Sequence, residues 1–173
     1  MTKPMTALLV IAALIIALAA GWGLNLYNLQ KQEKQQQAIA SLDKGIALFH
    51  EEKYAESLDL LQSIPDDTIV DWHLPYYTAT AHVMLKDYQA AAPILEEALA
   101  INPQETQIMF ELGVVYFKLG KLNLSKSYFA AVVEIDPSNE DARGLMDIMA
   151  NLERQQPGAD QADSESEAIQ QQQ

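Results

Sequence analysis

The sequence predicts an all-α protein, a solenoid of three helix pairs plus a C-terminal capping helix, preceded by a single transmembrane helix. Two observations support this prediction. A helix-turn-helix pattern that starts at Thr78 recurs 34 residues later at Leu112, and a run of twenty residues near the N-terminus carries no charge. Units of this length cannot bury their apolar faces alone, so they stack into a solenoid.

The predicted transmembrane helix covers residues 5–27 and follows a short tail of residues 1–4. Between residues 5 and 24 only Thr6 is polar. Twenty residues at about 1.5 Å each make a helix of about 30 Å, the thickness of a bilayer's hydrocarbon core. Two aromatic residues follow where interfacial anchors are expected, Trp22 and Tyr27. The alternative is a cleaved secretory signal peptide, because Ala17-Leu18-Ala19 has the small residues of a cleavage site.

The charges that flank this helix give only a weak preference for orientation. Lys3 lies on one side, and Lys31 and Lys34, partly offset by Glu33, lie on the other. A short N-terminus left inside with a large exported domain is the commoner arrangement. The sequence therefore predicts a single-pass membrane protein with an exported soluble domain, which is periplasmic if the source is a bacterium.

Residues 28–37 form a polar stalk rich in Gln, Lys and Glu, which are good helix formers. Neither Gly nor Pro occurs from there until Gly45. The membrane helix is therefore expected to continue into the first repeat as a semi-rigid stalk. A flexible polar linker is the alternative.

The repeat domain is predicted over residues 38–155. Its repeats cover about 38–71, 72–105 and 106–139, and the capping helix covers 138–155. Equivalent positions hold similar residues: small ones on the first helix (Gly45, Ala79, Gly113), small ones on the second (Ser57, Ala91, Ser125) and large apolar ones (Leu61, Leu95, Phe129). Small residues let two helix backbones approach closely, and the large residue fills the space between pairs.

This pattern resembles the tetratricopeptide repeat, whose period is 34 residues. The third copy fits it at Leu112, Gly113, Tyr116, Ser125, Phe129 and Pro137. The second copy departs from it at Thr78 and His82, and Ile69 replaces the proline in the first. The resemblance implies a scaffold that binds other proteins, and it names no partner. Asn102-Pro103 and Asp136-Pro137 each offer an N-cap followed by a proline, so each is predicted to begin a helix.

The net charge of -13 is concentrated in the repeats, where residues 45–154 hold seven basic and eighteen acidic side chains. A surface of this sign repels phosphate backbones, which argues against nucleic-acid binding. Residues 156–173 are acidic and Gln-rich with almost no bulky apolar side chains. They cannot bury enough surface to offset their ordering entropy, so they are predicted to be disordered.

No residues form a catalytic or metal-binding pattern. His50 begins the segment HEEKY, in which Tyr54 stands where a zinc-binding H-E-x-x-H motif requires its second histidine. Nothing assembles a nucleophile with a base and an orienting group. The sequence therefore predicts no enzyme activity, no metal and no cofactor.

The first helix of each tetratricopeptide repeat lines the concave face, so the resemblance implies a protein-binding groove there. Its predicted residues are Phe49, His73, Tyr76, Thr80, Val83, Phe110, Val114, Phe117 and Lys118. The face is mostly apolar with Lys118 as its one firm cation, which suits an apolar or amphipathic segment. Tetratricopeptide domains that clamp chaperone C-termini hold the terminal carboxylates with several Lys, Arg and Asn residues. Those residues are missing here, so this subclass is not expected. Tyr76, Phe110 and Phe117 are predicted to be exposed anchors. The alternatives are that this stripe is core, or that the groove serves homo-oligomerisation.

Overall fold

The computed structural model describes the backbone of residues 3–65, 68 and 71–155, and within that range the side chains of residues 18–152 and 154. The described chain is all-α, without strands, as predicted. Its helices are α1 (Lys3–His50), α2 (Tyr54–Gln62), α3 (His73–Met84), α4 (Tyr88–Ile101), α5 (Thr106–Lys118), α6 (Leu122–Ile135) and α7 (Glu140–Gln155).

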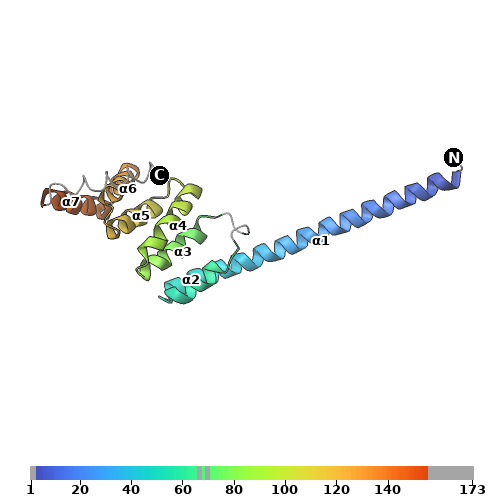
Figure 1. Cartoon of the computed structure of the whole chain (residues 1–173), viewed down its shortest axis with the longest axis horizontal. Coiled ribbons are helices and arrows are strands. Elements are labelled where there is room, and N and C mark those ends of the chain that lie inside the picture. The colour runs from blue at the N-terminus through green and yellow to red at the C-terminus, as the bar shows by residue number, and fades with distance from the viewer. Residues whose placement is uncertain (1–2, 66–67, 69–70, 156–173) are drawn as a thin grey trace, which may run out of the picture.

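Helix α1 is uninterrupted over 48 residues, about 70 Å, and Figure 1 shows that it projects far from the other helices. The polar segment 28–37 is therefore helical, and from residue 18 onward, where side chains are described, the first buried one on α1 is that of Ala38. Much of the predicted membrane segment, residues 5–17, has its side chains outside the described residues. Among the residues that are described, no helix is both long and apolar enough to cross a membrane. The predicted disordered tail, 156–173, lies outside the described residues.

The C-terminal part of α1 pairs with α2, α3 pairs with α4, and α5 pairs with α6, with α7 at the end of the stack (Figure 1). Within the first and third pairs, a glycine on one helix faces a large side chain on the other. A Cβ placed on Gly45 would lie 2.5 Å from Leu61 Cδ2, and one on Gly113 would lie 2.6 Å from Phe129 Cε1. The second pair uses Ala79 with Leu95 instead, and both are fully buried. The small residues thus allow the predicted close approach of the two helices, and the large residue packs against the small one of its own pair.

A serine supplies a second link inside the same two pairs. Ser57 Oγ donates to the Gly45 carbonyl at 2.8 Å, and Ser125 Oγ donates to the Gly113 carbonyl at 2.7 Å. Both hydroxyls are fully buried, so the bond satisfies a group that would otherwise be costly to bury.

In each of the three pairs, the turn between the two helices contains one residue with a positive φ angle. Glu52, Lys86 and Gly120 follow one another at intervals of 34 residues, and their φ angles are 62°, 65° and 76°. Of these three, only glycine adopts a left-handed conformation without a steric cost.

The predicted helix starts at Asn102 and Asp136 are wrong. These residues end α4 and α6, while α5 begins at Thr106 and α7 at Glu140. Asp136 Oδ1 accepts bonds from the Ser138 backbone N–H (3.0 Å) and hydroxyl (2.6 Å), which turns the chain before the next helix. Asn139 is the residue that caps α7, because its Oδ1 accepts from the Ala142 N–H at 2.9 Å.

Candidate protein-binding groove

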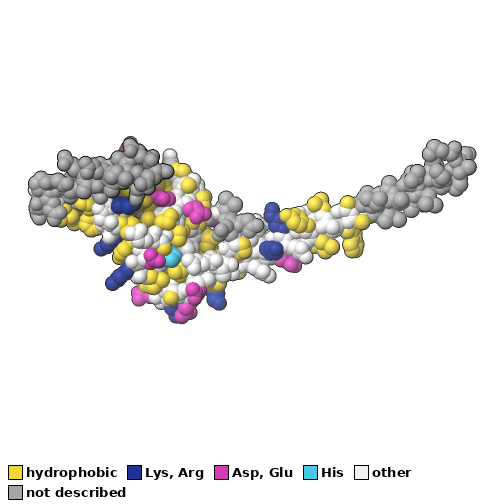
Figure 2. All heavy atoms as spheres, viewed as in Figure 1, with side chains coloured by type: hydrophobic (Ala, Val, Ile, Leu, Met, Phe, Trp, Pro, Cys, Tyr) yellow, Lys and Arg dark blue, Asp and Glu magenta, His cyan; other side chains and the backbone are white. Residues whose placement is uncertain are grey.

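The predicted groove residues lie on α1, α3 and α5, the first helices of their pairs, which contact one another in sequence. Most of them are partly exposed apolar side chains: Phe49, Val83, Phe110, Val114 and Phe117. Met84 and Ile148 are 47% and 50% exposed on α3 and α7. Figure 2 shows one face of the molecule, on which hydrophobic side chains cover much of the repeat region, with Asp and Glu side chains scattered among them.

The expectation that Tyr76 is an exposed anchor is wrong. Its side chain is only 5% exposed and belongs to the core cluster that also holds Ile108 and Leu112. Gln107 Nε2 donates to the Tyr76 hydroxyl at 2.7 Å, so the phenol is satisfied although buried. Burial, together with the nearby Glu111 carboxylate, raises the pKa of Tyr76 well above its ordinary value. Thr80 is also buried, 7% exposed, and its hydroxyl donates to the Tyr76 carbonyl.

An aromatic cluster joins the first pair to the second. Phe49 meets Tyr77 edge to face with ring centroids 5.5 Å apart, and Tyr77 meets Tyr76 at 5.3 Å. Trp72 continues the series, since its ring lies 5.7 Å from that of Tyr76. Such pairs are favoured beyond their buried area. Phe49 is therefore half in the core and half at the surface.

His73 begins α3 and is fixed on two sides. Its ring stacks on Trp72 at 3.9 Å, and its Nδ1 lies 2.5 Å from Asp71 Oδ1. Burial by itself would raise the pKa of Asp71, but hydrogen bonds from the His73 backbone and ring lower it overall. Asp71 and His73 therefore form a hydrogen-bonded polar pair next to the aromatic cluster.

The third repeat presents Phe110, Val114 and Phe117 against the cluster formed by α5, α6 and α7. Phe110 leans on the buried Phe129 ring, with centroids 5.4 Å apart. Phe117 and Val114 are half-buried, and Lys118 is exposed. Phe117 therefore remains the clearest candidate for an aromatic anchor, whereas Phe110 also supports the core.

Sequence reasoning missed Glu111. It lies one turn after Gln107 on α5, is half-buried, and faces Tyr76 closely enough to affect its ionisation. Burial raises the pKa of the Glu111 carboxyl. Only the excess of acidic residues over basic ones in the repeats hinted that a carboxylate would lie here.

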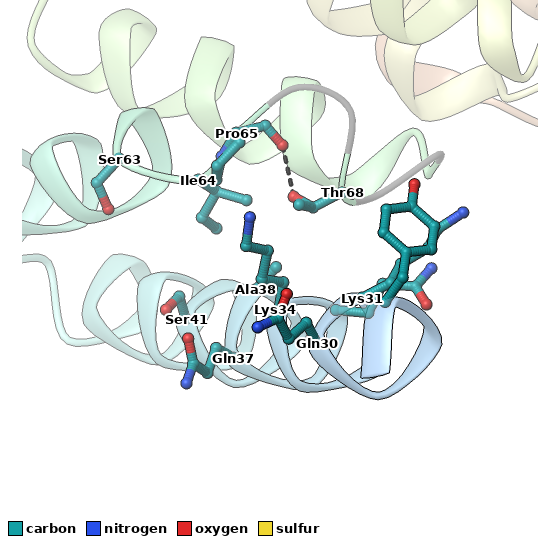
Figure 3. Close-up of a pocket in the computed structure, with 12 residues that line it drawn as sticks. Gln30, Lys31, Lys34, Gln37, Ala38, Ser41, Ser63, Ile64, Pro65 and Thr68 are labelled. Carbon is teal, nitrogen blue, oxygen red and sulfur yellow. Dashed lines mark hydrogen bonds between the residues drawn. The ribbon is translucent and has the colours of Figure 1, made fainter. Parts of the chain in front are cut away.

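A separate cleft of about 560 Å³ lies between α1 and the connection from α2 to α3. Figure 3 shows Lys31 and Lys34 on α1 with Pro65 and Thr68 on the other side, where the Thr68 hydroxyl donates to the Pro65 carbonyl. No sequence pattern indicated this cleft, because it depends on the path of an irregular connection.

Among the described side chains, no three of the His, Asp and Glu residues converge to hold a metal ion. His82, for example, contacts Asp87 Oδ2 and the Gln62 amide, each at 3.3 Å.

Comparisons with known proteins agree with this architecture. Residues 82–152 match the family model for the tetratricopeptide repeat. Human RNA polymerase II-associated protein 3 is 29% identical over 126 residues, which are 70% of this chain and 19% of that protein. The chain spans about a fifth or less of the length of the curated relatives that it matches.

Two solved structures share the fold at 27% identity and a TM-score of 0.64. The first TPR of Spaghetti (RPAP3), bound to the HSP90 peptide SRMEEVD, aligns over 68% of this chain and 94% of its own. YrrB, a TPR protein with an unusual peptide-binding site, aligns over 70% of this chain and 63% of its own. Residues 82–152 are therefore similar to the tetratricopeptide repeat, and the repeat region shares its fold with these two structures.

Proposed function

We propose that this chain is a membrane-anchored adaptor. Its repeat domain holds an apolar or amphipathic segment of a partner protein and so assists the assembly or maintenance of a membrane or envelope complex. The observation that carries this proposal is the row of half-exposed apolar side chains on α3 and α5, among them Val83, Val114 and Phe117. Exposed apolar surface of this kind usually marks an interface.

The membrane part of the proposal rests on the sequence of residues 5–24, which is uncharged and long enough to span a bilayer. The continuous helix α1 links that segment to the first repeat without a break. In this proposal the repeat domain is exported, and periplasmic if the source is bacterial. Release of a soluble domain by signal cleavage is the rival, and the mass of the mature protein separates the two: loss of the first 19 or so residues would refute a retained anchor.

The groove is tested by comparing Phe117→Ala with a matched control, Ile135→Ala. Ile135 is 51% exposed on α6, outside the first-helix face. The full chain is captured with its partners from detergent-solubilised membranes, and thermal unfolding of each variant is measured. Truncation of an aromatic anchor costs about 2 kcal/mol or more at a binding hot spot, so Phe117→Ala should weaken capture of a given partner by about thirtyfold.

The control should capture that partner as wild type does, and both variants should keep the wild-type midpoint. Equal capture by Phe117→Ala and wild type would refute the groove. A large fall in the midpoint of Phe117→Ala would instead identify its side chain as core. A second copy of this chain as the captured protein would support the homo-oligomeric scaffold in place of the adaptor.

A further inference from the structure

One carboxylate in the groove lacks a partner. Glu111 is half-buried on α5, and within the described part of the chain it forms no hydrogen bond and no ion pair. Two other acidic side chains of the repeats are engaged: Glu96 accepts from the Tyr116 hydroxyl, and Asp71 accepts from the His73 backbone N–H. Its oxygens are not fully buried, but partial burial disfavours the charged carboxylate and raises its pKa, so a cation placed against Glu111 would supply an interaction that the described chain lacks.

The position of Glu111 places it beside the proposed binding surface. Gln107, four residues earlier on the same face of α5, reaches across to the Tyr76 hydroxyl on α3. Glu111 therefore lies at the junction of α3 and α5, next to Val114 on the apolar row. Lys118 is on the same side of α5 but two turns further, about 10 Å along the helix axis.

The repeat region as a whole is acidic. Residues 45–154 carry more than twice as many acidic as basic side chains. Two lysines of the repeats are already engaged: Lys53 pairs with Glu51, and Lys121 lies over the Tyr116 ring at 5.6 Å. An acidic peptide such as SRMEEVD, which the Spaghetti domain binds, would bring further carboxylates toward Glu111. A cationic group would find an opposite charge there.

We propose that the occupant of the groove is an amphipathic segment of a partner protein that carries a lysine or arginine, and that this side chain pairs with Glu111 between α3 and α5. The inference rests on the proposed function, because it names the chemistry of the segment that the same groove would hold. Pairing in a partly desolvated groove fixes the register of the segment as well as adding affinity.

The test uses three synthetic 16-residue peptides with identical apolar residues at helical spacing and one central variable position occupied by lysine, norleucine or glutamate. Binding of each labelled peptide to the full chain in detergent micelles is measured by fluorescence anisotropy. The variants are Glu111→Gln and a matched control, Glu134→Gln, which changes an exposed carboxylate on α6.

Wild type and Glu134→Gln should bind the lysine peptide about tenfold more tightly than the norleucine peptide, and the glutamate peptide most weakly. Glu111→Gln should remove this preference and leave binding of the norleucine peptide unchanged. The inference would be overturned if wild type bound the lysine and norleucine peptides equally well, or if Glu111→Gln and Glu134→Gln lost the preference for the lysine peptide to the same extent. Either result would leave the proposed groove standing. If none of the three peptides binds, the proposed function fails together with it.

Discussion

The close approach of Gly113 to Phe129 makes Gly113→Ala a sharp test of the packing. The new Cβ would lie 2.6 Å from Cε1, 2.8 Å from Cζ and 2.9 Å from Cδ1 of the Phe129 ring. Carbon atoms in contact prefer about 3.5–4.0 Å, so the ring would have to move by about 1 Å. Phe129 is fully buried and cannot move without displacing its neighbours.

Two effects of this substitution oppose each other. Overpacking of a core costs about 1–3 kcal/mol, whereas replacing glycine by alanine inside a helix gains about 1 kcal/mol. Gly144→Ala isolates the second effect, because a Cβ there would meet nothing within 4 Å. The difference in unfolding free energy between the two variants is therefore the packing cost alone, about 1–3 kcal/mol, with Gly113→Ala the less stable.

The second repeat indicates how the damage is repaired. It carries Ala79 opposite Leu95, so Phe129→Leu should make room for alanine at position 113. Thermal unfolding of the full chain in detergent micelles, followed by circular dichroism, should show the double variant to be more stable than the two single effects added together, by about 0.5–3 kcal/mol. Additive effects, or a Gly113→Ala variant as stable as Gly144→Ala, would refute the packing argument.

Two further predictions concern buried polar groups. Burial gives the Glu111 carboxyl a higher pKa in the folded than in the unfolded chain. The protonated form therefore stabilises the folded state at pH values below the ordinary glutamate pKa of 4.5, and this stabilisation is lost as the pH rises through the folded-state pKa. The groups near Glu111 are Tyr76 on α3 and Lys118 on its own helix. The Glu111→Gln variant should have a higher thermal midpoint than wild type at pH 7, and this difference should shrink toward pH 4.5. A midpoint difference that grows on acidification would contradict the prediction. Ser125→Ala removes the bond to the Gly113 carbonyl and should cost about 1 kcal/mol, or about 2–4 °C in midpoint. Ser127→Ala on the exposed side of α6 should change little; equal midpoints for the two variants would show that the buried bond contributes nothing.

The repeat packing was predictable from sequence because it depends on a local periodic rule. The same pairing of a glycine with a large apolar residue sixteen positions later occurs in Gly45 with Leu61 and in Gly113 with Phe129. In each case it brings the two helices of one repeat close together. The helix starts were less predictable, since an Asp before a proline either caps a helix or stabilises a turn. Asp136 forms the turn because Ser138 offers it both a backbone N–H and a hydroxyl.

The groove was only partly predictable, because equivalent positions in repeats do not meet equivalent neighbours. Tyr76 and Phe110 occupy the same place in their repeats, yet Tyr76 is buried and Phe110 is half-exposed. The difference arises from residues outside the pattern: Trp72 and Tyr77 enclose the Tyr76 ring, and Gln107 of the next repeat satisfies its hydroxyl. Glu111 depends in the same way on the spacing of two helices, which no single repeat encodes.

The unbroken helix α1 also fixes the direction in which the groove faces, measured as a rotation about the axis of α1. Each residue added within 28–37 would turn the repeats by about 100° about the helix axis and raise them by about 1.5 Å. Seven added residues would complete two turns less about 20°. The groove would then face nearly its original direction, displaced by about 10 Å along the helix axis. In the proposed adaptor, the length of the stalk therefore decides both how far from the bilayer a partner is met and from which side it can approach.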